Sequence, residues 1–203
     1  MSTERRRRSD GERSRSAILD QAAQLATVEG IEGLSIARLA DAVGMSKSGL
    51  FAHFGSKEEL QLATVDAARA LFAERVTDAA VDAPTALKRL RRLIEAYLGY
   101  LESETFAGGC FFASALAEVD MRPGPVRDRL VEFRDEWLGR LEAAIREAQA
   151  EGAISPDEDP SQLVFELEAA LFLANAQFIV ARSPEPIERA RRAIDRRLAA
   201  AAG

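Results

Sequence analysis

The sequence predicts an all-α fold of about nine helices, divided into a small N-terminal unit of three helices and a larger C-terminal helical domain. Ala, Leu, Arg and Glu dominate the 203 residues, and this composition favours helix over strand. The seven prolines fall between long stretches in which apolar residues recur at helical spacing. A hydrophobic content of 47% can bury a substantial core, so the chain is expected to be globular.

The chain opens with a basic segment that has no helical periodicity. Residues 1–60 carry 9 basic and 9 acidic groups, so the rest of the chain carries the whole net charge of −6. The early positive charge is concentrated in Arg5, Arg6, Arg7, Arg8, Arg13 and Arg15. We expect residues 1–13 to be a disordered arm, either a solubilising tail or a source of phosphate and minor-groove contacts.

Three helices are expected next, over residues 14–60. Glycine at position 30 should stop the first helix, and Ser35 should cap the second. Gly44 suits a left-handed C-terminal cap for that second helix, and Ser46 can cap the third. The short spacing of these signals predicts a compact three-helix unit.

The remaining residues, 61–203, are expected to form the larger domain. Ser56 and Glu59 have the spacing of a capping box and open a long fourth helix that continues through Val76 and joins the two parts. Glycines and prolines separate the later helices. These are expected over residues 84–101, 110–119, 126–148, 161–182 and 185–200.

The last two expected helices have an unusual apolar pattern. Residues 161–182 are apolar around more of the helix than one core face needs, while residues 185–200 carry a narrow apolar seam among arginines. Such helices pack against further helices, so both are expected to form a homodimer surface. A charge such as Leu171→Glu should then disrupt the dimer or the fold.

A cytoplasmic location is expected. The single cysteine, Cys110, cannot form an internal disulfide, and no apolar run follows the N-terminal arginines as in a signal peptide. The most apolar segment, Val164 to Ala181, contains Glu166, Glu168 and Asn175, which favours a buried helix over a membrane span.

Residues 35–54 have the pattern of a helix-turn-helix. This motif needs one helix braced on the core, a tight turn with a glycine, and a second helix whose outer face is small and polar enough to enter a major groove. Leu50 and Phe54 are expected to pack inward. The outer face is expected to consist of Ser46, Lys47, Ser48, Gly49 and Ala52.

The stretch Gly-Met-Ser-Lys-Ser-Gly-Leu-Phe-Ala-His-Phe-Gly-Ser-Lys-Glu-Glu-Leu, residues 44–60, resembles the recognition-helix signature of the TetR family of transcriptional regulators. The similarity covers residues 17–60, and residues 108–125 resemble the effector domains of one branch of that family. The resemblance implies base-edge contacts from Ser46, Lys47, Ser48 and Gly49, and phosphate contacts from Ser35, Phe51, His53 and Lys57. The family usually has tyrosine where this chain has Phe51, so the contact of Phe51 is expected to be van der Waals only.

The resemblance also implies a mechanism. Residues 61–203 would bind a small-molecule effector and dimerise, two recognition helices would read a palindromic double-stranded DNA operator, and effector binding would relieve repression. Residues expected to line the effector pocket are Tyr97, Tyr100, Phe106, Phe111, Phe112, Phe165, Trp137, Phe172 and Asn175.

Alternatives stay open for single residues. His53 could be a buried structural histidine, Lys57 could be solvated in a first helical turn, and Cys110 could be a redox sensor or a small core residue. Aromatic residues at helical spacing could equally be plain core. The alternative function is a helical ligand carrier or interaction module that binds no duplex DNA.

An enzyme is not expected, and neither a metal nor a cofactor. Helical di-metal sites use Glu-x-x-His pairs, but the single histidine of the chain lies inside the helix-turn-helix. The sequence contains no Gly-rich phosphate loop, nucleophile elbow or Cys/His metal cluster.

Overall fold

The computed structural model describes residues 3–119 and 123–202, with side chains from Ser14 onward. The described residues form helices and no strands, as predicted. The N-terminal part contains α1 (Thr3–Glu29), α2 (Ile36–Val43) and α3 (Lys47–Phe54). The longer remainder contains α4 (Lys57–Phe72), α5 (Ala86–Glu102), α6 (Phe111–Val119), α7 (Pro125–Ala150), α8 (Pro160–Ala181) and α9 (Glu185–Ala201).

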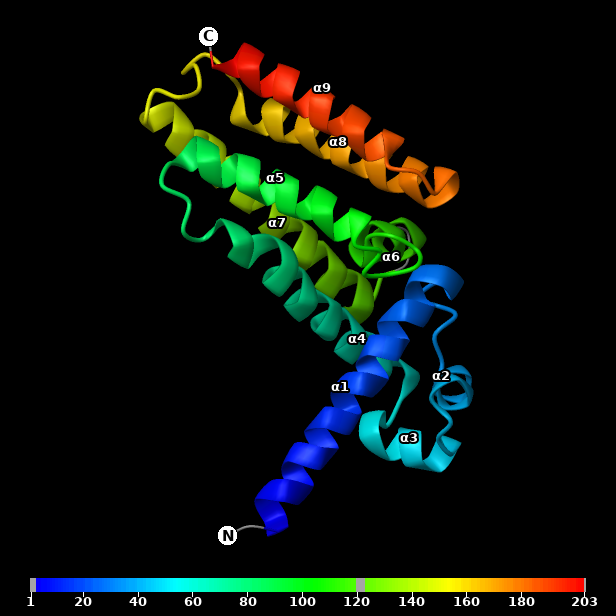
Figure 1. Ribbon diagram of the computed structural model, residues 1–203. Helices are drawn as coiled ribbons and strands as arrows, with labels where there is room; N and C mark the ends of the chain where they lie inside the picture. Colours follow the sequence, from blue (N-terminus) through cyan, green and yellow to red (C-terminus); the bar gives the residue numbers. More distant parts are fainter. Residues whose placement is uncertain (1–2, 120–122, 203) are drawn as a thin grey trace.

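The elements are arranged in two parts along the molecule (Figure 1). Helices α2 and α3 lie beside α1 at one end, while α8 and α9 run side by side along the opposite edge and cover α5 and α7. Helix α4 leads from the first part into the second. The α3 and α8–α9 surfaces are therefore well separated in space.

Two boundaries differ from the sequence-based expectation. Helix α1 begins at Thr3, so the backbone is helical over residues 3–13, where a disordered arm was predicted, because no proline interrupts this Arg/Glu-rich segment. Residues 1–2 of that arm lie outside the described residues. Helix α4 ends at Phe72, and a π-helical turn (Ala73–Thr77) and a 3-10 turn (Asp78–Ala80) follow it instead of the α-helix expected through Val76.

The caps agree with the sequence signals. Ser35, Ser46 and Ser56 each accept a hydrogen bond from a backbone N–H in the first turn of the helix that they precede. Gly44 adopts a left-handed conformation with φ of 68° and closes α2. These caps confirm where α2, α3 and α4 begin.

The buried apolar residues form two clusters. The smaller cluster joins α1, α2, α3 and the first turn of α4, and the larger one joins α4 to α9 together with Ala23, Ala26 and Ile31 from the end of α1 and the turn after it. Leu60 belongs to the first and Val65 to the second, so the change from one core to the other falls within α4. The expected boundary between residues 60 and 61 lies at this change and stays a prediction.

The two cores meet at a junction made of side chains that bind main-chain atoms. The Glu118 carboxylate accepts hydrogen bonds from Ile31 N at 2.7 Å and Glu32 N at 3.0 Å, in the turn between α1 and α2. Gln61 Nε2 donates to Ile31 O at 2.7 Å, and Gln24 Nε2 donates to Thr105 O at 2.7 Å. These bonds hold the α1–α2 turn against α4 and α6.

Candidate functional site

Helix α3 presents a polar, largely uncovered face. Its Leu50 and Phe54 side chains are buried, as predicted. Lys47 and Ser48 are exposed, and Phe51 keeps 56% of its surface accessible, which is unusual for a phenylalanine. A short helix with one anchored face and one free face has the shape that a DNA major groove admits.

Arg15 of α1 holds the C-terminal end of α3. Its guanidinium donates to His53 O at 2.7 Å and lies 4.5 Å from the centre of the Phe54 ring. A cation at this end of a helix is favoured by the helix dipole, and its position over the ring adds a cation–π contribution. Arg15 was counted with the basic arm, but the structure uses it to position α3.

The other residues expected to contact DNA flank α3. Ser46 Oγ accepts from Gly49 N at 3.1 Å and lies 3.3 Å from Ser48 Oγ, so the N-terminal turn of α3 is already ordered by its own side chains. Ser35 Oγ accepts from Arg38 N at 3.2 Å at the start of α2. These positions and that of the half-buried His53 suit the expected contacts, which stay predictions.

Lys57 lies in the first turn of α4 and is engaged within the chain. Its ammonium donates to Glu32 O at 2.6 Å and lies 3.7 Å from the Glu32 carboxylate. The lysine side chain is 47% exposed, so it also reaches solvent. Lys57 therefore ties the α1–α2 turn to α4, and the phosphate contact expected of it stays a prediction.

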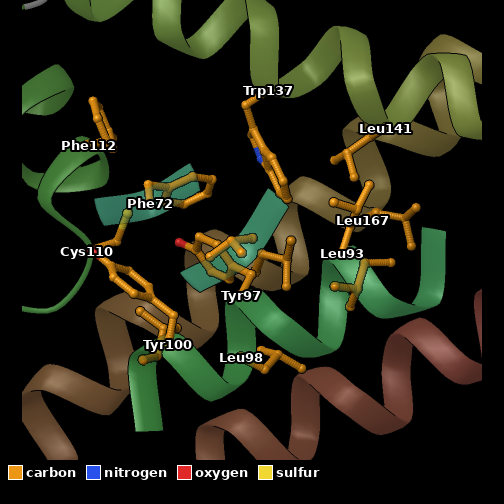
Figure 2. Close-up of a cluster of buried hydrophobic side chains, with 14 of the residues drawn as sticks. Phe72, Leu93, Tyr97, Leu98, Tyr100, Cys110, Phe112, Trp137, Leu141 and Leu167 are labelled. Atoms are coloured by element: carbon orange, nitrogen blue, oxygen red, sulfur yellow. The ribbon is translucent and has the colours of Figure 1, made fainter. Parts of the chain in front are cut away.

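A cavity of about 390 Å³ lies in the larger part of the molecule. Of the pocket residues expected from the sequence, Tyr97, Phe112, Trp137 and Phe172 form part of its wall. Figure 2 shows the rings of Phe72, Tyr97 and Trp137 gathered close to Cys110 and Phe112. The volume lies within the range of small-molecule sites.

The other five expected pocket residues lie elsewhere. Tyr100 and Phe111 are buried in the surrounding core, and Phe106 lines a separate groove beside α1 and α4. Phe165 is 69% exposed on α8, and Asn175 accepts a hydrogen bond from Cys110 N at 2.8 Å. Helical spacing alone does not distinguish residues of the cavity wall from residues of the surrounding core. The buried amide oxygen of Asn175 has its hydrogen-bonding need met by a backbone N–H, without a ligand.

Several residues of the cavity wall were not predicted from the sequence. Phe72 comes from the end of α4, and Phe133 lies on α7 one turn before Trp137. Glu168 was noted as a charge within an apolar helix, but it was not assigned to the pocket. A charge placed in so apolar a segment was the available signal for this site.

Burial controls the protonation of three groups around the cavity. Desolvation raises the pKa of Glu168, while the hydrogen bond from Trp137 Nε1, at 3.1 Å, opposes this shift. Burial also raises the pKa of the Tyr97 hydroxyl and of the Cys110 thiol. A thiol held in its neutral form reacts slowly, so Cys110 fits a packing role better than a redox role.

Glu168→Gln is expected to stabilise the fold at neutral and alkaline pH. Burial raises the pKa of Glu168 in the folded state above its ordinary value of 4.5, so the folded state binds this proton more tightly than the unfolded state does. As the pH rises from the ordinary pKa to the folded-state pKa, the wild type therefore loses stability relative to the variant, which has no proton to lose at this position. In urea unfolding, the free energy of unfolding of Glu168→Gln should exceed that of the wild type by the full amount at pH 8 and by little at pH 4.

Glu166→Gln, two residues away, is the matched control with the opposite sign. Hydrogen bonds from Gln162 and Arg197 lower the pKa of Glu166, so this variant should be less stable than wild type at pH 8, with the difference shrinking as the pH falls. If both variants responded to pH in the same direction, the assignment for Glu168 would be wrong.

Helix α8 exposes an apolar face. Phe172 and Leu173 are 51% and 54% exposed, and Phe165 and Val180 are 69% and 85% exposed. Their spacing places all four along one side of α8, over about 22 Å. We call these four residues the α8 face. By length and composition alone, α8 could also cross a membrane, although 39% of its apolar window is buried within the chain.

Helix α9 differs from its expected role in one respect. The seam of Ile187, Ala190, Ile194 and Leu198 is buried in the larger core of its own chain. Its outward positions are mostly charged, as Arg189 and Glu185 illustrate with an ion pair at 2.7 Å. The uncovered apolar surface therefore belongs to α8, because the seam of α9 is already used within the chain.

Among the described residues, no group of three or more His, Cys, Asp and Glu side chains is arranged to hold a metal ion.

Two family models match the chain. Residues 18–64 match the model described as "Bacterial regulatory proteins, tetR family", and residues 86–194 match "Tetracyclin repressor-like, C-terminal domain". The first range contains α2 and α3, and the second contains the cavity wall from Tyr97 to Phe172.

Individual relatives agree with the family models. The transcriptional regulator AcuR of Cereibacter sphaeroides is 28% identical over 138 residues, which are 68% of this chain and 63% of AcuR, less than two thirds of that relative. A TetR transcriptional regulator from Chloroflexus aurantiacus superposes with a TM-score of 0.83 at 26% identity, covering 94% of this chain and 95% of that one. AibR in complex with isovaleryl coenzyme A and operator DNA gives a TM-score of 0.67 at 27% identity, covering 80% and 86%.

Proposed function

The chain belongs to the TetR family of bacterial transcriptional regulators, and from this we propose that it is a homodimeric repressor whose operator binding is released by a small-molecule effector. The observation that carries the proposal is the uncovered face of α3, with Lys47, Ser48 and Phe51 outward and Leu50 and Phe54 anchored. The similar protein AibR was solved with isovaleryl coenzyme A and operator DNA, which supports both a small-molecule effector and a DNA operator as partners of this chain. The protein then acts by binding and not as an enzyme, in the cytoplasm and without a membrane.

The α8 face supports dimerisation by a second copy of this chain. Large apolar side chains spaced along one helix are costly to leave in water, and a two-fold contact lets the same face cover itself. A two-fold dimer reads a palindromic operator, with its recognition helices about 34–36 Å apart or a modest multiple of that spacing.

The route from effector to DNA runs through α6. One side of α6 contributes Phe112, Ala113 and Leu116 to the cavity wall, and Glu118 near its end binds the α1–α2 turn. A ligand that displaces α6 would therefore move the turn that carries α2 and α3.

Selection from a pool of random duplex DNA at several salt concentrations tests the proposal. We expect enrichment of a palindrome. Lys47→Ala should change which sequences are enriched, whereas Lys57→Ala should weaken binding to all of them and reduce the salt slope by about 0.9.

Lys88→Ala supplies the control, since Lys88 is the remaining lysine of the chain and lies exposed on α5. It should leave both the selected sequence and the salt slope unchanged. Weak, unselective retention of DNA by the wild type would instead favour a helical ligand carrier.

A further inference from the structure

Six aromatic rings from five helices contribute to the cavity wall. They are Phe72, Tyr97, Phe112, Phe133, Trp137 and Phe172. Phe72 meets Trp137 edge to face, with ring centres 5.3 Å apart, and Tyr97 stacks on Trp137 at 6.0 Å. Aromatic faces carry partial negative charge, so a lining of this kind attracts an organic cation as well as an apolar group.

Glu168 places a carboxyl group in this otherwise apolar wall. Trp137 Nε1 donates to it at 3.1 Å, and no arginine or lysine among the described residues forms an ion pair with it. A carboxylate can accept about four hydrogen bonds, and a partly desolvated charge without a counter-ion is costly. Among the described residues, Glu168 therefore has a hydrogen-bond donor but no cationic partner.

Two arginines also line the cavity, but their charges are balanced near the surface. Arg134 pairs with Asp135 at 2.6 Å, and Arg127 lies 3.9 Å from Asp128. Their side chains are 49% and 38% exposed, so water screens both charges. Arg127 and Arg134 thus disfavour a ligand that carries a second positive charge near them. They do not cancel the attraction of Glu168 for a single positive charge.

We propose that this cavity binds an organic monocation, an amine or quaternary ammonium on an apolar body, with the positive charge against Glu168 and the body among the aromatic rings. The proposal rests on the ligand-responsive function proposed above and specifies the class of effector. An organic anion would bring like charge to Glu168, and a neutral molecule would leave the charge of Glu168 uncompensated.

The test uses two probes of the same shape. Benzyltrimethylammonium and neopentylbenzene differ in a positively charged nitrogen against a neutral carbon. Trp137 is the single tryptophan of the chain and lies in the cavity wall, so its fluorescence reports binding without DNA. We expect the wild type to bind the cation about 10-fold more tightly than the neutral probe.

Glu168→Gln should remove this preference while keeping the affinity for the neutral probe, and Glu166→Gln should leave both affinities unchanged. Circular dichroism verifies that each variant is folded. Equal affinity of the wild type for both probes, preference for the neutral probe, or no binding of the cation would each overturn the proposal, and so would a preference that survives in Glu168→Gln.

Operator binding, measured separately, distinguishes this proposal from the proposed function. If the cation binds at Glu168 but never alters DNA affinity, the ligand class stands and the regulatory role fails. If DNA selection yields a palindrome but the cation preference is absent, the regulator stands and the ligand class fails.

Discussion

Glutamates at both ends of the α8 face, in the double variant Phe165→Glu/Val180→Glu, are expected to convert the proposed dimer into a monomer and to weaken operator binding by about 100-fold or more. Both side chains are largely exposed, so the fold of the single chain should tolerate the change. In the dimer, the four introduced charges would face an apolar surface and one another. Each monomer then binds its half-site alone and loses the high effective concentration of the second recognition helix.

Light scattering after size-exclusion chromatography measures the mass, and fluorescence anisotropy with a palindromic duplex measures the affinity. Val81→Glu is the matched control, because Val81 is equally exposed at 69% but lies outside α8. An unchanged dimeric mass for the α8 variant would rule out this interface. Leu171→Glu, suggested by the sequence alone, tests the fold instead, since Leu171 is fully buried.

The second large effect is expected for Gly108→Ala. A Cβ atom at this position would lie 1.9 Å from Thr27 O and 2.5 Å from Thr27 C, which are main-chain atoms of α1. Neither atom can rotate away, so the junction between α1 and the α5–α6 segment must separate. We expect a loss of about 3 kcal/mol in the free energy of unfolding.

Urea unfolding gives this free energy, and Gly139→Ala provides the control. Gly139 lies within α7, and an added Cβ there meets no atom within 4 Å, so alanine should stabilise the helix by up to about 1 kcal/mol. Equal stability of Gly108→Ala and wild type would show that the junction is looser than the structure describes.

The start of each helix was predictable because the signals are local. Ser35, Ser46 and Ser56 bind backbone groups within three residues, so sequence spacing alone identifies them. The inward side of α3 was predictable for the same reason, since Leu50 and Phe54 repeat at helical spacing.

The cavity was only half predictable, because its wall depends on how distant helices meet. Tyr97 and Tyr100 are neighbours on α5, yet only Tyr97 reaches the wall. Phe72 reaches it because α4 ends beside α7, which no local pattern encodes. Asn175 looked like a ligand-binding residue until its backbone partner, 65 positions away, was known.

The junction between the two cores tolerates sequence change unevenly. Glu118, Gln24 and Gln61 bind main-chain atoms, and every residue type except proline offers the same N–H and C=O groups. Replacing Ile31, Glu32 or Thr105 would therefore leave these bonds chemically unchanged. What limits change along the α1–α2 turn is packing, because Ile31 and Leu34 are buried and a Cβ at Gly30 or Gly33 would clash. The partly exposed Glu32 is under no such limit, so related chains could vary at this position and still couple their two parts through the same main-chain bonds.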